Sequence, residues 1–459
     1  MASSGKNKVI IDTDPGVDDV LAMLLAFAAT PEEIEISLIS VTFGNVDVQN
    51  CLRNVVSLFH HIDKEWEWRS KMGKPEGFET LKKHKPLVAI GADGPLADQV
   101  MMADFFHGRD GLGGIHASHP HLSPEETWKD LFATTPNSPD AQEILQSKHL
   151  FTASKLSAHE QMLQLLRDNE ADTITIVAIG PLTNVALAAA TDTQTFLRVK
   201  EVVVMGGVLD EPGNMTPVAE FNTYADTIAA ARVFALTSPN PISTMPPVPP
   251  KPAEMAKIEG SEPPPPFLGP YPKKLGKQLK LTLFPLDITS HHPLTRGTFN
   301  AFVSEHLSTG SPIAEWVAAF ISSTFAKIET LDRDASGDAV SLALHDPLTI
   351  WYVLTHPSSS SELASKWRFA TPEGEEEDIR VETAGQWTRG MMVVDRRNRK
   401  KMDRELEVDG DVLEEVPGDA GNWLSSRAGN RVKRAVGSPG EEEFGSRITM
   451  QHKQGNPGF

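Results

Sequence analysis

The sequence predicts an α/β protein built on a mainly parallel, open sheet that is flanked by helices on both faces. Apolar runs typical of buried strands alternate with helical segments through the first half of the chain. Each strand-like run ends in Asp, Asn or Gly, and the 459 residues can bury a large core, as one large domain or two smaller ones. Because the carboxyl ends of parallel strands line one edge of a sheet, we expect these polar residues to converge there.

The elements of this sheet are predicted in chain order. The apolar residues 9–11 form the first strand, Pro15-Gly16 turns the chain, and residues 20–27 form a buried helix. The later elements are strands at 34–43, 86–90, 173–179 and 201–205, an Ala-rich helix at 185–190, and a strand that ends at Leu286-Asp287.

Three stretches interrupt this alternation and are interpreted as insertions, at residues 64–84, 119–157 and 237–280. The first is charged, the second is rich in Pro and Ser, and the third contains proline runs that favour an extended polyproline loop. Residues 399–459 are mixed in charge and rich in Gly, so we expect an irregular C-terminal extension.

Composition argues against several function classes. The 62 Asp and Glu residues outnumber the 43 Lys and Arg residues, and the net charge of -19 argues against nucleic acid or an anionic membrane as the main partner. Cys51 is the only cysteine, which excludes a disulfide within the chain and a zinc site of several cysteines. Residues 1–8 lack the apolar stretch of a signal peptide, and no apolar run reaches the ~18 residues of a membrane span. We therefore expect a soluble, cytoplasmic protein.

The most informative segment follows the first predicted strand, where four carboxylates lie close together: Asp12, Asp14, Asp18 and Asp19. Such carboxylates repel one another unless a cation is present, and their hard oxygen atoms favour Ca²⁺ or Mg²⁺ over a soft metal. One alternative is that Asp18 and Asp19 only stabilise a helix N-terminus. Another is the Asp-x-Asp turn of a phosphatase, which the following Pro15-Gly16 fits poorly.

Residues 12–19, Asp-Thr-Asp-Pro-Gly-Val-Asp-Asp, closely resemble the signature of the inosine-uridine preferring nucleoside hydrolase family. Later blocks resemble the same family in its own order, at 42–45, 107–114, 179–184, 205–207 with 213–222, and 344–347. The resemblance covers most of residues 8–398 outside the three insertions. It implies the Rossmann-like fold of that family in a single large domain, followed by the extension at 399–459.

Members of that family use water to cleave the N-glycosidic bond of ribonucleosides, which gives ribose and free base. The resemblance implies that Ca²⁺ is held by the side chains of Asp14, Asp19 and Asp346 and by the backbone carbonyl of Ile179. It also implies that Asp14 accepts the proton of the attacking water. Asp12 then supports the site from behind these ligands.

The substrate-facing positions also come from the resemblance. The ribose-binding residues are Asp18, Asn45, Asn214, Glu220 and Asn222, and Met205 packs near the ribose. Glu220 and Asn222 are two residues apart, which in an extended segment directs both to one side. His345 is the candidate general acid or base-contacting residue, because a histidine can donate a proton near neutral pH, and His107 approaches the base from its loop. His116, His119 and His121 lack the partners of a zinc site and are interpreted as a surface loop.

Base preference and assembly stay open. The three tyrosines are Tyr224, Tyr271 and Tyr352, so none lies between residues 300 and 345, where pyrimidine-preferring members place a tyrosine against the base. Family members are commonly dimers or tetramers. The leading hypothesis is a Ca²⁺-dependent ribonucleoside hydrolase of purine and pyrimidine salvage. The alternatives are a non-catalytic nucleoside- or Ca²⁺-binding protein and a phosphatase of the Asp-x-Asp type.

Overall fold

A nine-stranded sheet forms the centre of the part of the chain that the structure describes. The structure is a computed structural model, and it describes residues 7–97, 99–132, 149–246, 268–272, 275–356, 363–371, 376–397, 423 and 429–439. The strand order is β10-β13-β7-β6-β5-β1-β2-β3-β4. Neighbouring strands are parallel, except that β10 is antiparallel to β13 at one edge. The predicted mainly parallel, open sheet is confirmed.

The strand positions follow the apolar runs of the sequence. The strands of the large sheet are β1 (Asn7–Thr13), β2 (Ile34–Val41), β3 (Leu87–Ile90), β4 (Thr152–Ala153), β5 (Ile174–Ala178), β6 (Glu201–Met205), β7 (Leu281–Phe284), β10 (Arg368–Phe369) and β13 (Lys433–Gly437). Two small antiparallel pairs are β8 (Pro293–Thr295) with β9 (Ser341–Ala343), and β11 (Ile379–Val381) with β12 (Met392–Val394). The late strand ends at Phe284, so Leu286-Asp287 begins a short helix instead.

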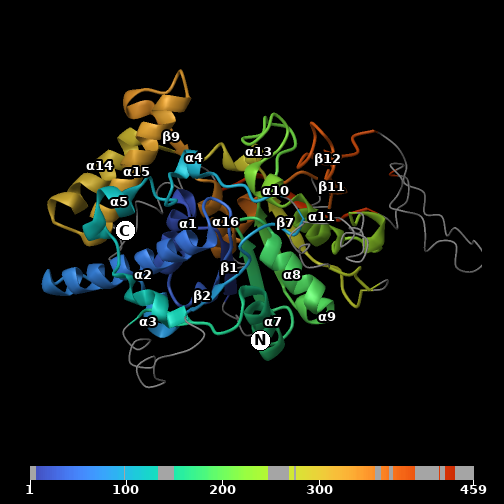
Figure 1. The fold of residues 1–459 in the computed structure, drawn as a ribbon, viewed down its shortest axis with the longest axis horizontal. Coiled ribbons are helices and arrows are strands. Elements are labelled where there is room, and N and C mark those ends of the chain that lie inside the picture. Colours follow the sequence, from blue (N-terminus) through green and yellow to red (C-terminus); the bar gives the residue numbers. More distant parts are fainter. Residues whose placement is uncertain are drawn as a thin grey trace, which may run out of the picture.

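Helices cover both faces of the sheet (Figure 1). One face carries α1 (Val17–Ala28), α2 (Val48–Lys71), α3 (Glu79–Lys83), α14 (Arg296–Ser308), α15 (Pro312–Leu331) and α16 (His345–Thr355). The other face carries α7 (Ala158–Asp168), α8 (Thr183–Thr191), α9 (Thr193–Phe196) and α11 (Thr227–Ala235). The shorter helices are α4 (Asp104–His107), α5 (Ile115–Ser118), α10 (Phe221–Ala225) and α13 (Leu286–Thr289). Helices α1 and α16 pack against each other although they are far apart in the sequence.

The strand order reverses beside β1. The chain adds β2, β3 and β4 on one side of β1 and then crosses over to add β5, β6 and β7 on the other side. In open α/β sheets such a reversal leaves a crevice at the carboxyl ends of the two central strands, and ligands bind there. Asp14 follows β1 and Ile179 follows the adjacent strand β5. The topology therefore places these two residues on the two sides of that crevice.

The first two predicted insertions are partly regular structure. Residues 64–71 of the first insertion continue helix α2 without a break. The charged residues of this insertion do not indicate a loop. Glu65 and Arg69 are both buried and pair with each other at 2.7 Å across one helical turn. The second insertion contains β4, which pairs with β3 at the edge of the sheet, while residues 133–148 lie outside the described residues.

The C-terminal boundary at residue 398 is also corrected by the structure. Strand β13 lies inside the large sheet, between β7 and β10. The sequence of this strand is not a continuous apolar run, because it contains charged residues. Arg434 in β13 pairs with Glu377 at 2.7 Å and with Asp210 at 3.1 Å. The remainder of the expected irregular extension, residues 399–422, 424–428 and 440–459, lies outside the described residues.

The two ends of the third insertion lie next to each other. The N–H group of Leu279 donates a hydrogen bond to the carbonyl of Leu236 at 2.9 Å, so the two ends of the insertion lie together. The proline run at 263–266 lies outside the described residues. None of the helices that the structure describes is long and apolar enough to cross a membrane.

Candidate active site

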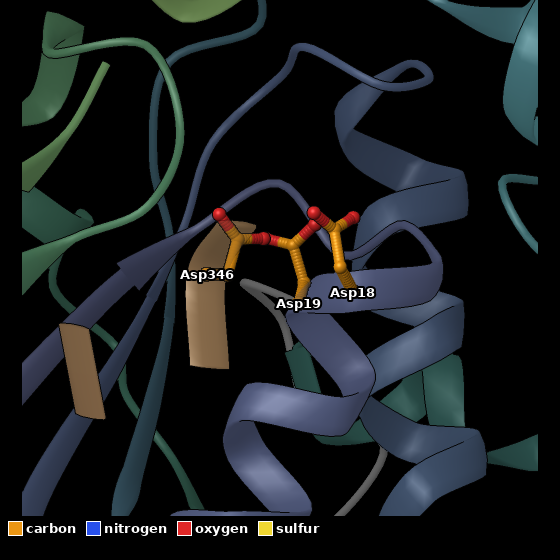
Figure 2. Close-up of side chains that lie close together, drawn as sticks. All are labelled: Asp18, Asp19 and Asp346. Atoms are coloured by element: carbon orange, nitrogen blue, oxygen red, sulfur yellow. The ribbon is translucent and has the colours of Figure 1, made fainter. Parts of the chain in front are cut away.

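Three carboxylates from two helices meet at the carboxyl edge of the sheet. Asp18 and Asp19 lie in the first turn of α1, and Asp346 lies in the first turn of α16. One oxygen of each residue lies within 4.8 Å of the others, and all three residues are buried. Figure 2 shows the side chains pointing toward one another. The structure thus brings Asp19 and Asp346 together, and it adds Asp18, which the resemblance had assigned to the ribose.

Asp14 lies next to this cluster, directly after β1. Its Oδ2 accepts a hydrogen bond from the backbone N–H of Asn45 at 2.7 Å, while its buried Oδ1 has no partner. A Cβ atom added to Gly44 would overlap Oδ2, and one added to Gly180 would overlap Oδ1. Two strand-end glycines therefore enclose this carboxylate and leave one oxygen available for a ligand.

The Asp14 turn is connected to Asp19 by short polar contacts. The Thr13 hydroxyl donates to Asp19 Oδ1 at 2.6 Å, and the Gly16 N–H donates to Oδ2 at 3.0 Å. The Asn45 amide donates to the same Oδ2 at 3.0 Å and to the Asp14 carbonyl at 3.1 Å. Asn45 therefore orients the carboxylates here, in addition to facing the site as the resemblance implies.

Asp12 lies deeper, below Asp14. Its Oδ1 accepts hydrogen bonds from the Ser40 hydroxyl at 2.5 Å and from the Asn184 amide at 2.9 Å. The Asn184 side-chain oxygen in turn accepts from the N–H of Ala92 at 2.8 Å. Asn184 therefore connects the ends of three neighbouring strands, β1, β2 and β3, behind the site. Asp12 is fully buried and is one of the hydrogen-bond partners in this connection.

Burial raises the pKa of each carboxyl group in this region. The pKa of Asp18 rises to about 8, because the group is buried and because Asp19 is close by. The pKa values of Asp14 and Asp346 rise well above the usual range, mainly through burial and also through the neighbouring carboxylates. Burial likewise raises the pKa of Asp19. Positive charge is therefore needed for all four groups to be ionised together.

The donor set fits a hard divalent cation. The cluster offers one oxygen each from Asp18, Asp19 and Asp346, and the unpartnered oxygen of Asp14 lies beside it. The backbone carbonyl of Ile179 is at the adjacent strand end. Ca²⁺ accepts about six to eight oxygen ligands in flexible geometry, including carboxylates and carbonyls, whereas a soft metal prefers sulfur. Among the described residues this is the group that could hold such an ion.

We predict that the cation-free protein loses stability as the pH rises. The pKa of Asp12 is about 7 and that of Asp18 is about 8 in the folded state, both above the 3.8 of an ordinary aspartate. The folded state therefore binds more protons than the unfolded state above pH ~4, and the resulting stability is lost as the pH passes through those folded values.

Denaturant unfolding in the presence of a chelator, at pH values from about 5 to about 9, measures this effect. The free energy of unfolding should fall over that range in the wild type and fall less in Asp18→Asn. A wild-type free energy that stays level or rises contradicts the prediction.

The ends of β5 and β6 are joined by Asn222. Its amide nitrogen donates to the carbonyl of Ile179 at 3.2 Å and lies 3.4 Å from both the carbonyl and the sulfur of Met205. Asn222 and Met205 are both buried. The structure therefore brings Ile179, Met205 and Asn222 together, on the β5 side of the crevice.

Glu220 has a different local setting from the one expected. The segment at 220–222 is not extended, because Glu220 is the N-cap of α10 and Asn222 lies within that helix. The Glu220 carboxylate accepts N–H bonds from Asn222 at 2.6 Å and from Gly207 at 2.7 Å. Asn214 is exposed, and its side-chain oxygen accepts from the N–H of Phe221 at 2.9 Å. The two-residue spacing could not distinguish a strand from a helix start.

Two histidines, the buried His107 and the half-buried His345, lie beside the acidic residues in the sequence or in space. The Nδ1 atom of His345 lies 2.7 Å from the hydroxyl of Thr289, and the N–H of Val17 donates to His107 Nδ1 at 3.4 Å. Burial lowers the pKa of His345 to about 4, and that of His107 to about 4, with the charge of His345 adding to the latter shift. Both rings are therefore neutral at neutral pH.

The close fit around Asp14 leads to a prediction for Gly180. A methyl group there would overlap the Asp14 carboxylate and displace it from the site. Gly180→Ala should lower the rate of the reaction proposed below by about 10²-fold, the cost of a displacement near 1 Å. Gly276→Ala is the matched control, since a Cβ there meets nothing within 4 Å. Equal rates for the two variants contradict the prediction.

Sequence reasoning missed several residues that shape the site. Thr13 and Asn184 lie inside blocks that carry the resemblance, yet they received no role of their own. The available signal was a position close to a strand end, because Thr13 is the last residue of β1 and Asn184 lies in the first turn of the helix after β5. The direction of each side chain depends on contacts with distant segments, so no local pattern reveals it.

Comparisons with known proteins identify the family of the chain. A family model described as "Inosine-uridine preferring nucleoside hydrolase" matches residues 9–417. The chain is 27% identical over 387 residues to the pyrimidine-specific ribonucleoside hydrolase RihA of Salmonella paratyphi B, covering 84% of this chain and 88% of that protein. It is 34% identical over 228 residues to uridine nucleosidase 1 of Arabidopsis thaliana, covering 50% of this chain. The chain spans only 53%, or about half, of the length of that plant relative.

Solved structures share the fold. A plant nucleoside hydrolase, PpNRh1, matches with a TM-score of 0.58 at 21% identity, covering 96% of each chain. A purine-preferring ribonucleoside hydrolase from Gardnerella vaginalis matches with a TM-score of 0.59 at 20% identity, covering 97% of this chain and 99% of that one. Because the family model spans residues 9–417, most of the sequence, the chain belongs to the inosine-uridine preferring nucleoside hydrolase family.

Proposed function

We propose that the protein is a Ca²⁺-dependent hydrolase that cleaves the N-glycosidic bond of ribonucleosides, as part of nucleoside salvage. The observation that carries this proposal is the buried meeting of Asp18, Asp19 and Asp346 beside Asp14 at the sheet reversal. The names of the relatives, a uridine nucleosidase and a pyrimidine-specific ribonucleoside hydrolase, support the reaction type.

The cation would be held by Asp14, Asp19, Asp346 and the carbonyl of Ile179, with Asp18 close enough to contribute. When bound, such a cation supplies the positive charge that keeps the carboxylates ionised and lowers the pKa of water near it. The unpartnered Oδ1 of Asp14 supports this assignment, because a buried carboxylate oxygen without a partner is costly.

Asp14 is the proposed general base. A water oxygen forms a bond to the anomeric carbon of the ribose while the bond from that carbon to the base nitrogen breaks. The proton of the water passes to the Asp14 carboxylate, and the electron pair of the broken bond leaves with the base. Asn45, which donates its N–H to Asp14, fixes the direction of the accepting oxygen.

The remaining polar residues would bind the two halves of the substrate. Asn222 and Glu220, with Asn214 at the rim, are proposed to bind ribose hydroxyls, and Met205 forms the apolar floor. His345 is proposed to donate a hydrogen bond from its Nε2–H to the departing base, which takes its proton from solvent water, since the Thr289 hydroxyl can donate to Nδ1. His107 lies close to His345 and would contact the base from the loop.

Release of reducing sugar from a panel of purine and pyrimidine ribonucleosides tests the proposal, with Ca²⁺ present and Asp14→Ala run in parallel. Wild-type release that is lost in the variant supports the hydrolase and ranks the bases. Nucleoside binding without sugar release contradicts it in favour of a non-catalytic binding protein. Phosphate release from a phosphomonoester with Mg²⁺ contradicts it in favour of a phosphatase. A cytoplasmic location and a dimeric or tetrameric assembly stay predictions.

A further inference from the structure

One buried amide links two segments of the candidate site, the turn after Asp14 and the loop after His107. Asn54 lies in α2 with none of its surface exposed. Its amide nitrogen donates to the carbonyl of Pro15 at 2.8 Å and to the carbonyl of Asp110 at 2.8 Å. Pro15 follows Asp14 directly, and Asp110 belongs to the loop that follows His107. Both donor hydrogens of Asn54 are therefore used to join the Asp14 turn to that loop.

His116 fixes the orientation of this amide. The side-chain oxygen of Asn54 lies 2.9 Å from His116 Nε2, and His116 Nδ1 lies 2.7 Å from the hydroxyl of Ser123. An amide oxygen only accepts, so Nε2 carries the proton and Nδ1 accepts from Ser123. His116 is buried, which replaces the earlier interpretation of this histidine as part of a surface loop.

The loop itself has one well-defined conformation. The Asp110 carboxylate accepts N–H bonds from Leu112 at 3.0 Å, from Gly114 at 2.7 Å and from His116 at 2.9 Å. Gly111 has a φ of +81°, and a Cβ there would lie 2.7 Å from the Asn54 amide nitrogen. Only a glycine allows the loop to lie this close to Asn54.

We propose that Asn54 and His116 are positioning residues that hold the loop at 107–114 against the turn at Pro15. This inference rests on the proposed function, because it assigns the loop to the base and the turn to the water. The bonds of Asn54 run to backbone atoms of both segments, so a shift of either segment must break one of them. The chain thereby fixes the position of His107 relative to Asp14.

The test uses the full-length, Ca²⁺-loaded protein and three variants. His116→Leu removes the donor to Asn54, His116→Gln keeps an N–H donor at a similar reach, and His121→Leu is the matched control at an exposed histidine of the same segment. Amide hydrogen exchange across residues 107–116, Ca²⁺ affinity, and kcat and KM for a ribonucleoside are measured in each.

In His116→Leu, we expect exchange in residues 107–116 to become about tenfold faster, because a buried hydrogen bond of ordinary strength is lost. The ratio kcat/KM should fall about tenfold, mainly through KM, since the loop contacts the base rather than the reacting bond. Ca²⁺ affinity should stay within about twofold, as His116 contacts none of the acidic residues that would bind the cation. His116→Gln should restore most of both losses, and His121→Leu should change neither.

Unchanged exchange in His116→Leu overturns the proposal, and so does faster exchange with a wild-type kcat/KM. Asn54→Asp, which keeps the shape and removes the donors, is a second route to the same readouts. If the wild type itself hydrolyses no nucleoside, only the proposed function is contradicted. The proposed role of His116 and Asn54 is still tested by hydrogen exchange, because that measurement needs no substrate.

Discussion

Asp14→Asn is expected to hydrolyse ribonucleosides about 10²- to 10⁴-fold more slowly than the wild type, the range of a general base. The substitution preserves the size of the side chain between Gly44 and Gly180, and the Asn45 N–H can still bond to the remaining oxygen. The amide cannot accept a proton from water. The loss should therefore appear in kcat measured at saturating Ca²⁺, because the amide oxygen of asparagine can still act as a cation ligand.

The matched control for Asp14→Asn is Asp47→Asn. Asp47 caps α2 by accepting N–H bonds from Gln49 at 3.0 Å and Asn50 at 3.1 Å, and asparagine caps a helix equally well. Its activity should be unchanged. If the kcat of Asp14→Asn is within about threefold of the wild-type kcat, Asp14 is not the general base.

Asp346→Asn is expected to lose divalent-cation binding, and the stability that the cation provides, together with activity. Binding to the folded state alone stabilises a protein by on the order of 2.7 kcal/mol at a concentration 100-fold above Kd. Calorimetry should show that Ca²⁺ raises the unfolding temperature of the wild type, that a chelator reverses this rise, and that Asp346→Asn does not respond.

Asp192→Asn is the control for that calorimetric experiment, because Asp192 caps α9 through the N–H of Thr195 at 3.0 Å, far from the acidic cluster in the sequence. It should respond to Ca²⁺ like the wild type. If the unfolding temperature of Asp346→Asn still rises with Ca²⁺, Asp346 is not a ligand of the cation.

The central strands could be predicted because a parallel strand that is covered on both faces is a continuous apolar run. The predicted and observed bounds of β6 (Glu201–Met205) coincide. Strand β13 could not be predicted in this way, since its charged Arg434 is neutralised by Glu377 and Asp210, far away in the sequence. Strand β4 has only two residues, too few for any periodicity.

The residue types of the site could be predicted, but their directions could not. The carboxylates at the β1 turn pointed to an acidic site, yet the position of Asp18 beside Asp346 depends on the packing of α1 against α16. Glu220 accepts backbone N–H bonds from Gly207, a contact between two loops that spacing along the chain does not encode. Neither the neutral state of His345 nor the burial of His116 can be read from the motif, because both follow from tertiary burial.

Hydrolysis of the N-glycosidic bond is tested most directly by a product analysis with the Ca²⁺-loaded wild type in phosphate-free buffer, using ¹⁸O-labelled water. A hydrolase should give one equivalent of free base and one of ribose for each nucleoside consumed, with the label at the anomeric oxygen of the ribose. Nucleoside that is bound but recovered intact, or cleavage that requires added phosphate, would contradict hydrolysis.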